Sequence, residues 1–475
     1  MTLILEKENN KKKCQKFTPE HIVNTMLDLA DYKENLVGKT VLESAFGSGN
    51  ILKAIVIRYI EAAKKEKIDK THISKGLSED IYGVELDQAL YDICINELNA
   101  ITAKYGLPRV SWNLYQGDAL AIDFDRKFDF IIGNPPYISY TKMDEVTRKR
   151  TKEAFKSCKK GKFDYCYAFI ESGINVLKEK GRMVQLIPNN IYKNVFAQEL
   201  REILVDHITS IYDYPNQKLF DDALTSVSIF LYNKTYCSED VHYKNVTTGK
   251  SERIQRRDLK GKWVFSTNKV SAASAIRFGD IFHASVTVAT LCNKAYLVNQ
   301  TSIVSESLEE ESIRKTASPK TLRAGKTSFI IFPYKYEKGA LIRFSNNEFE
   351  SSCPNIVKHL QRYSKDLELR DSDKNAAWYE YGRSQALIHL NKEKLLLSAI
   401  VTKCVEVYRI NAETIPFSGI YITVKDDRYS LDDAIKILKS EQFMEYVREI
   451  GISISGQSLR ISCKDINDYM FIMGD

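Results

Sequence analysis

The chain has 475 residues, of which 44% are hydrophobic and 28% are charged, with a formal net charge of +7. This length favours two domains, the composition excludes a disordered protein, and the lack of any run of about 18 apolar residues predicts no membrane-spanning helix. The nine cysteines contain no CxxC pair and no Cys/His cluster with zinc-ligand spacing, and the apolar stretch at 1–5 is too short for a secretory signal, so we expect a cytoplasmic protein with no bound metal and no membrane partner.

Helix and strand signals alternate from residue 18 to residue 232. The dipeptide Thr18-Pro19 is typical of a helix start. The expected elements are, in chain order, a helix at 18–29, a strand at 40–43, a helix at 51–63, strands at 81–85, 110–114 and 128–132, a helix at 167–178, a strand at 183–187 and a closing hairpin of 208–212 and 226–232. This alternation predicts a doubly wound, mostly parallel α/β sheet of the Rossmann-like type, which binds ligands at the carboxyl ends of its strands.

The second half of the chain differs from the first in charge and in pattern. Residues 1–240 carry 34 Lys and Arg against 34 Asp and Glu, whereas residues 241–475 carry 35 against 28. Beyond residue 240 the alternation fades, and strand-like pieces mix with basic and aromatic turns. We therefore expect a neutral catalytic domain at 1–240 and a basic, mixed α+β domain at 241–475 that binds a polyanion.

Three polar features follow the first three expected strands. The turn Glu43-Ser44-Ala45-Phe46-Gly47-Ser48-Gly49 lets the backbone approach a ligand closely, although it lacks the third glycine of the dinucleotide fingerprint. Glu85 can accept hydrogen bonds from both hydroxyls of a ribose. Asp118 can accept one from the amino group of an adenine. Each feature alone fits a plain turn or a solvated carboxylate, but their order at successive strand ends favours a nucleoside-containing cofactor.

The fourth expected strand runs into Asn134-Pro135-Pro136-Tyr137. The amino nitrogen of adenine is a poor nucleophile because its lone pair is delocalised into the ring. The side-chain oxygen of Asn134 and the carbonyl of Pro135 can accept hydrogen bonds from its two hydrogens and so localise that lone pair. Prolines stiffen the turn and preorganise these acceptors, and Tyr137 offers a ring for a base to stack on. A simple proline turn at the end of a strand is the alternative.

Together these motifs identify a resemblance. The order Lys16-Phe17-Thr18-Pro19, the glycine turn, Glu85, Asp118 and Asn-Pro-Pro-Tyr resembles the gamma-class (TaqI-like) amino-methyltransferases of restriction–modification systems. The resemblance implies S-adenosyl-L-methionine as the cofactor and catalytic roles for Asn134, Pro135 and Tyr137. It also implies that Phe220 stacks on a flipped adenine, and that the cofactor is bound by Thr18, Glu43, Ala45, Gly47, Glu85, Asp118 and Pro136. In the glycine turn the chain departs from the many members that carry a proline after the acidic residue.

A basic segment follows the catalytic turn. Between residues 141 and 162 lie nine Lys and Arg against three acids, and we expect Lys149 and Arg150 to contact DNA phosphates, with a solvated helix face as the alternative. Residues 329–334 and 378–385 resemble the C-terminal specificity domain of the same family. We therefore expect residues 241–475 to be a DNA-recognition domain, although the aromatic residues of the second stretch also fit a core.

These observations predict a site-specific DNA adenine methyltransferase. We expect it to methylate the exocyclic amino group of a flipped-out adenine in double-stranded DNA and to serve as the modification enzyme of a restriction–modification system. A separate cognate restriction endonuclease is compatible with this interpretation. Two alternatives stay open, namely an RNA adenine methyltransferase and a protein-glutamine methyltransferase, because a planar amide nitrogen poses the same chemical problem. A third interpretation, a catalytically silent DNA-binding protein, is disfavoured by the intact set of motifs.

Overall fold

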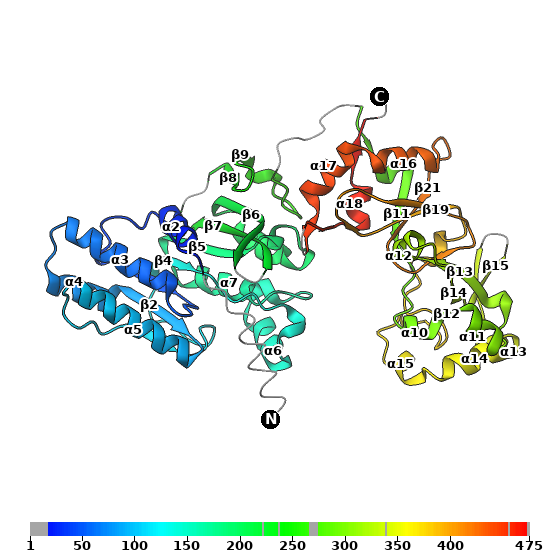
Figure 1. The fold of residues 1–475 in the computed structure, drawn as a ribbon, viewed down its shortest axis with the longest axis horizontal. Coiled ribbons are helices and arrows are strands. Elements are labelled where there is room, and N and C mark those ends of the chain that lie inside the picture. Colours follow the sequence, from blue (N-terminus) through cyan, green and yellow to red (C-terminus); the bar gives the residue numbers. More distant parts are fainter. Residues whose placement is uncertain are drawn as a thin grey trace. The chain divides into compact units, whose positions relative to one another are not determined.

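The computed structural model describes residues 18–220, 223–235, 238–265, 274–337, 340–454 and 457–472 (Figure 1). The chain forms two compact units, Met1–Thr267 and Asn268–Asp475. Strand β8 (Asp240–Asn245) pairs in parallel with β6 (Ile208–Phe220), and β9 (Ser251–Gln255) pairs with β8. The first unit therefore ends after residue 267 and not at the expected residue 240, because these two strands extend its sheet.

A nine-stranded sheet forms the centre of the first unit, in the order β3-β2-β1-β4-β5-β7-β6-β8-β9. The strands from β3 to β5 pair in parallel, and β7 pairs antiparallel with both β5 and β6. The expected Rossmann-like α/β fold and its closing hairpin β6–β7 are confirmed, while the third strand begins at residue 113 rather than 110. The bounds are β1 (Val41–Glu43), β2 (Ile81–Glu85), β3 (Asn113–Gln116), β4 (Phe128–Gly133), β5 (Leu177–Pro188) and β7 (Ala223–Asn233).

Helices cover both faces of this sheet. On β1, Val41 packs in a cluster with residues of α2, α3, α4 and α5, whereas its neighbour Leu42 packs in a cluster with residues of α7 and α8. Because successive strand residues point to opposite faces, the two clusters are the two covered sides of a doubly wound sheet. The helices are α2 (Glu20–Leu29), α3 (Asn50–Lys65), α4 (Lys70–Asp80), α5 (Gln88–Lys104), α6 (Glu145–Ala154), α7 (Cys166–Val176) and α8 (Gln198–Leu204).

The second unit mixes short strands with short helices. One sheet has the order β11-β21-β17-β19 and another the order β12-β14-β13-β20. Tyr379 and Tyr381, from the aromatic stretch 378–385, are buried in the core of this unit, and the hydroxyl of Tyr381 donates to the carbonyl of Ile331, so both rings pack within the fold. The bounds are β11 (Phe282–Val286), β12 (Leu297–Val298), β13 (Ile313–Ala317), β14 (Ser328–Ile331), β17 (Lys394–Leu397), β19 (Val407–Ile410), β20 (Ile415–Pro416), β21 (Ile420–Val424), α14 (Pro354–Gln361), α16 (Leu431–Lys439) and α17 (Glu441–Ile450). Among the residues that the structure describes, no helix has the length and apolar character needed to cross a membrane.

Candidate functional site

A cavity of about 480 Å³ opens where β1, β2 and β4 end, at the carboxyl edge of the parallel sheet. Ligands of doubly wound sheets bind at this edge. The structure brings ten of the predicted site residues together in the wall of this one cavity, and these are Thr18, Glu43, Ala45, Gly47, Glu85, Asp118, Asn134, Pro135, Pro136 and Tyr137. Arg150 also lines it, whereas Lys149 lies exposed on α6 outside the lining.

The glycine turn is held to the end of β2 by a carboxylate. One oxygen of Glu85 accepts a hydrogen bond from the backbone N–H of Gly47 at 2.7 Å, and the other accepts from the N–H of Asp87 at 2.9 Å. Gly47 and Gly49 have φ of 56° and 84°, a left-handed conformation that favours glycine. The turn therefore owes its shape to both its glycines and Glu85, and the Glu85 side chain stays in the cavity wall.

Glu43, the last residue of β1, is a buried acid in the cavity wall. Its side chain is 2% exposed, and its Oε2 has no hydrogen-bond partner among the described residues. Burial, with a further contribution from the charge of Glu85, raises the pKa of the Glu43 carboxyl well above its usual value. A buried carboxylate of this kind is stabilised by a ligand that brings positive charge or hydrogen-bond donors.

Asp118 and Arg150, which the sequence analysis assigned to different ligands, form an ion pair with each other. The Oδ2 of Asp118 lies 2.5 Å from Nη2 of Arg150, a residue of α6, and this contact raises the pKa of the arginine. The Oδ1 of Asp118 accepts from the N–H of Leu120 at 3.0 Å. The pair joins the end of the third strand to the basic helix that follows the catalytic turn.

The Asn-Pro-Pro-Tyr turn follows β4 and is fixed by two hydrogen bonds. The Nδ2 of Asn134 donates to Oγ1 of Thr18 at 3.1 Å, and the hydroxyl of Tyr137 donates to the carbonyl of Leu186 at 2.9 Å. The Oδ1 of Asn134 is buried and has no hydrogen-bond partner within the described part of the chain. Asn134 therefore presents an unused acceptor at the cavity, beside the buried Pro135.

The aromatic residues of the site include one that was predicted and two that were not. Phe220 is the last residue of β6, and its side chain lies outside what the structure describes. Tyr165 and Phe169, which were not predicted, also line the cavity, with ring centroids 5.4 Å apart. Their only local signal is their position on the segment that follows the catalytic turn.

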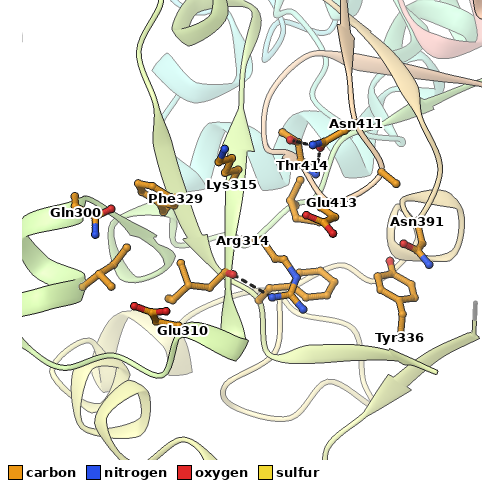
Figure 2. Close-up of a pocket in the computed structure, with 15 residues that line it drawn as sticks. Gln300, Glu310, Arg314, Lys315, Phe329, Tyr336, Asn391, Asn411, Glu413 and Thr414 are labelled. Carbon is orange, nitrogen blue, oxygen red and sulfur yellow. Dashed lines mark hydrogen bonds between the residues drawn. The ribbon is translucent and has the colours of Figure 1, made fainter.

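A second cavity, of about 730 Å³, lies in the second unit and carries charges of both signs (Figure 2). Arg314 lies with its guanidinium 5.9 Å from the ring centre of Phe332, and Glu413 stands on a loop at residues 411–414. The fully buried ammonium of Lys394 donates to the carbonyls of residues 411, 412 and 414 at 2.9, 3.1 and 3.2 Å, and burial lowers its pKa to about 8. This buried lysine fixes the loop that forms one wall of the cavity.

Residues 51–220 match the family model of the Eco57I restriction-modification methylases. The chain is 25% identical to the Type II methyltransferase M.BstVI of Geobacillus stearothermophilus, over 46% of this chain and 41% of that protein. It is 23% identical to the Type II restriction enzyme and methyltransferase RM.Eco57I of Escherichia coli, over 85% of this chain and 50% of that protein. The chain thus spans half or less of the length of these two relatives.

The fold also matches a solved structure over most of the chain. The Type IIL restriction-modification enzyme MmeI, determined in complex with DNA, superimposes with a TM-score of 0.59 at 14% identity, over 94% of this chain and 64% of that one. A nuclease-deletion mutant of the Type ISP enzyme LlaGI superimposes with a TM-score of 0.53 at 12% identity, over 89% of this chain and 50% of that one. At these identities the likeness concerns the fold, and both matches extend into the second unit.

Proposed function

Since residues 51–220 form a methylase domain of the Eco57I restriction-modification type, we propose that the chain is a site-specific DNA adenine methyltransferase with S-adenosyl-L-methionine as its cofactor. Its substrate is the exocyclic amino group of an adenine flipped out of double-stranded DNA. The observation that carries the proposal is the unused, buried acceptor of Asn134, in the same cavity as Glu43, Glu85 and Asp118.

The residues of the cavity fit the cofactor. Glu43 combines a raised pKa with a buried oxygen that has no partner among the residues described, and so suits a cationic amino group or sulfonium. Glu85 suits a ribose and Asp118 an adenine amino group. When bound, the cofactor supplies an electrophilic methyl group on a positively charged sulfur.

The acceptors of the catalytic turn prepare the nucleophile. Asn134 Oδ1 and the Pro135 carbonyl accept hydrogen bonds from the two N–H groups of the adenine amino group and so localise its lone pair. A cofactor held by Glu43, Glu85 and Asp118 would supply the methyl group to this nitrogen, which would lose one proton after the transfer. Fixed acceptors of this kind act without reorganisation in a site that excludes water.

Access to the amino group requires base flipping. Inside a duplex the adenine is stacked, and Asn134 and Pro135 cannot surround its amino group, so the nucleotide must leave the stack. The ring of Tyr137, held by its hydrogen bond to Leu186, offers one stacking surface. Phe220 is proposed as the other on the resemblance alone. Lys149 and Arg150 are proposed to contact the flanking phosphates, and the second unit to select the sequence.

Methyl transfer by the purified full chain tests the proposal. Duplex DNA, single-stranded RNA and a glutamine-containing peptide are each offered with radiolabelled cofactor, and DNA from an expressing bacterial host is sequenced for modified bases. We expect N6-methyladenine at one recurrent sequence in duplex DNA. Labelled RNA, labelled peptide or DNA modified at another base would each contradict the proposal in favour of a different substrate.

The variant Asn134→Ala tests the catalytic role of the Asn-Pro-Pro-Tyr turn. It removes one of the two acceptors and leaves the cofactor contacts in place, so we expect a loss of about 100- to 1000-fold in the methylation rate with cofactor affinity retained. A rate close to that of the wild type would show that the turn is not the catalytic element.

A further inference from the structure

The orientation of the Asn134 amide decides whether the catalytic turn can work. An amide presents an acceptor oxygen on one side and a donor NH2 on the other. Only the oxygen can accept from the amino group of a substrate, because the NH2 would set N–H against N–H. Rotation by half a turn about the last side-chain bond therefore separates a productive side chain from an inactive one.

Thr18 is the residue that meets the nitrogen side of this amide. Its Oγ1 lies 3.1 Å from Nδ2 of Asn134, across 116 positions of sequence. The opposite side, Oδ1, has no partner in the part of the chain that the structure describes, and it is buried. The hydrogen-bond pattern thus leaves the oxygen, and not the nitrogen, for a ligand.

Thr18 is itself held in place from two directions. Its side chain is 5% exposed, and its carbonyl accepts a hydrogen bond from Nδ2 of Asn50, the first residue of α3, at 3.4 Å. Directly after it, the carbonyl of Pro19 accepts from the N–H groups of Ile22 and Val23 in α2, whose inner face is buried in the core. The hydroxyl of Thr18 is therefore a fixed point in the cavity wall.

We propose that Thr18 is a positioning residue for methyl transfer, whose hydroxyl accepts a hydrogen bond from the NH2 of Asn134 in the orientation that points the amide oxygen at the amino group to be methylated. This inference rests on the proposed function. It differs from the role in cofactor binding that the family resemblance implies for Thr18. A cofactor contact governs cofactor affinity, whereas a positioning contact governs the rate once cofactor and DNA are both bound.

The two roles are separated with Thr18→Val and Thr18→Ser in the full chain. Valine has the shape of threonine without a hydrogen-bonding oxygen, and serine restores that oxygen. We measure the single-turnover methylation rate at saturating cofactor and DNA, together with cofactor affinity by calorimetry. Loss of one hydrogen bond predicts a rate about 3- to 10-fold lower for Thr18→Val, most of which Thr18→Ser restores, with cofactor affinity close to that of the wild type.

A double-mutant cycle with Asn134→Ala tests whether Thr18 acts through Asn134. If Thr18 acts through Asn134, then Thr18→Val has no further effect on the rate once Asn134→Ala is present. Three results overturn the inference: rate losses that multiply in the double variant, a Thr18→Ser rate as low as that of Thr18→Val, or a loss confined to cofactor affinity. A wild-type chain that methylates no adenine would instead refute the proposed function, because this inference concerns only ratios between variants.

Discussion

Cofactor binding should depend on pH through Glu43. The carboxyl is 2% exposed, and burial, reinforced by the charge of Glu85, raises its pKa well above the usual value in the free chain. A ligand that brings an ammonium group and a sulfonium into the cavity stabilises the carboxylate and lowers that pKa again. Binding therefore releases a proton from Glu43 at pH values between the lowered pKa of the complex and the raised pKa of the free chain.

The sign and the size of the effect follow from linkage. Between the lower pKa of the complex and the raised pKa of the free chain, affinity increases with pH, and above the raised pKa it is constant. Within that window the binding free energy changes by up to about 1.4 kcal/mol for each pH unit, so affinity falls up to tenfold for each unit of acidification. The variant Glu43→Gln loses a charge-assisted hydrogen bond, worth about 1.5–3 kcal/mol, and should bind roughly 10- to 100-fold more weakly at alkaline pH.

Calorimetry between about pH 5 and pH 9, in buffers of different ionisation enthalpy, measures both affinity and proton release. The α-amino group of the cofactor titrates near pH 8 as well. It does so with either protein, so the difference between wild type and Glu43→Gln isolates the contribution of the side chain. Equal pH profiles for the two proteins, or equal affinities at alkaline pH, would refute the role assigned to Glu43.

Two further predictions concern stability, measured without ligand. A Cβ at Gly49 would clash with Sγ of the buried Cys94, whereas a Cβ at Gly47 meets no atom within 4 Å. Because both glycines have positive φ, thermal melts should show a loss of stability of about 1–2 kcal/mol for Gly47→Ala, from backbone strain alone, and a larger loss of stability for Gly49→Ala. Equal losses of stability would contradict the packing argument. Burial lowers the pKa of Lys394 to about 8, so the buried ammonium penalises the folded chain below that pH, and the penalty is relieved as pH rises towards the ordinary pKa of 10.5. The stability of the wild type relative to Lys394→Met should therefore rise by about 2 kcal/mol between pH 8 and 10 in urea titrations, and a constant difference would contradict a buried ammonium.

The parts of the fold and site that sequence predicts are those encoded locally. A strand followed by a polar turn is a short pattern that can be recognised in the sequence. The carboxyl ends of parallel strands all lie at the same edge of the sheet, so the residues that follow them lie close together. Glu43, Glu85 and the Asn-Pro-Pro-Tyr turn consequently meet in one cavity, as their positions after strands predict. The start of α2 directly after Thr18-Pro19 is equally local, and Pro19 is its N-cap residue, although no side chain caps the helix.

The parts that sequence does not predict are pairings between distant side chains. Nothing near Thr18 or Asn134 in the sequence indicates that they form a hydrogen bond, since the contact depends on how α2 packs against the sheet. The domain boundary fails for a related reason. Strands β8 and β9 carry no signal of which unit they join, and only the parallel pairing of β8 with β6 assigns them to the first.

The ion pair between Asp118 and Arg150 is a contact between distant residues that bears on ligand binding. The side chains are 26% and 50% exposed, and ion pairs with this access to solvent contribute only about 0–1 kcal/mol. An amino group that offers Asp118 a comparable hydrogen bond can therefore displace Arg150 at little cost. Under the proposed function, the displaced guanidinium joins the exposed Lys149 on α6, beside the path of the DNA backbone. A weak contact of this kind can give way to a cofactor amino group at Asp118 and leave Arg150 for the phosphates, so the pairing of two residues assigned to different ligands is compatible with both assignments.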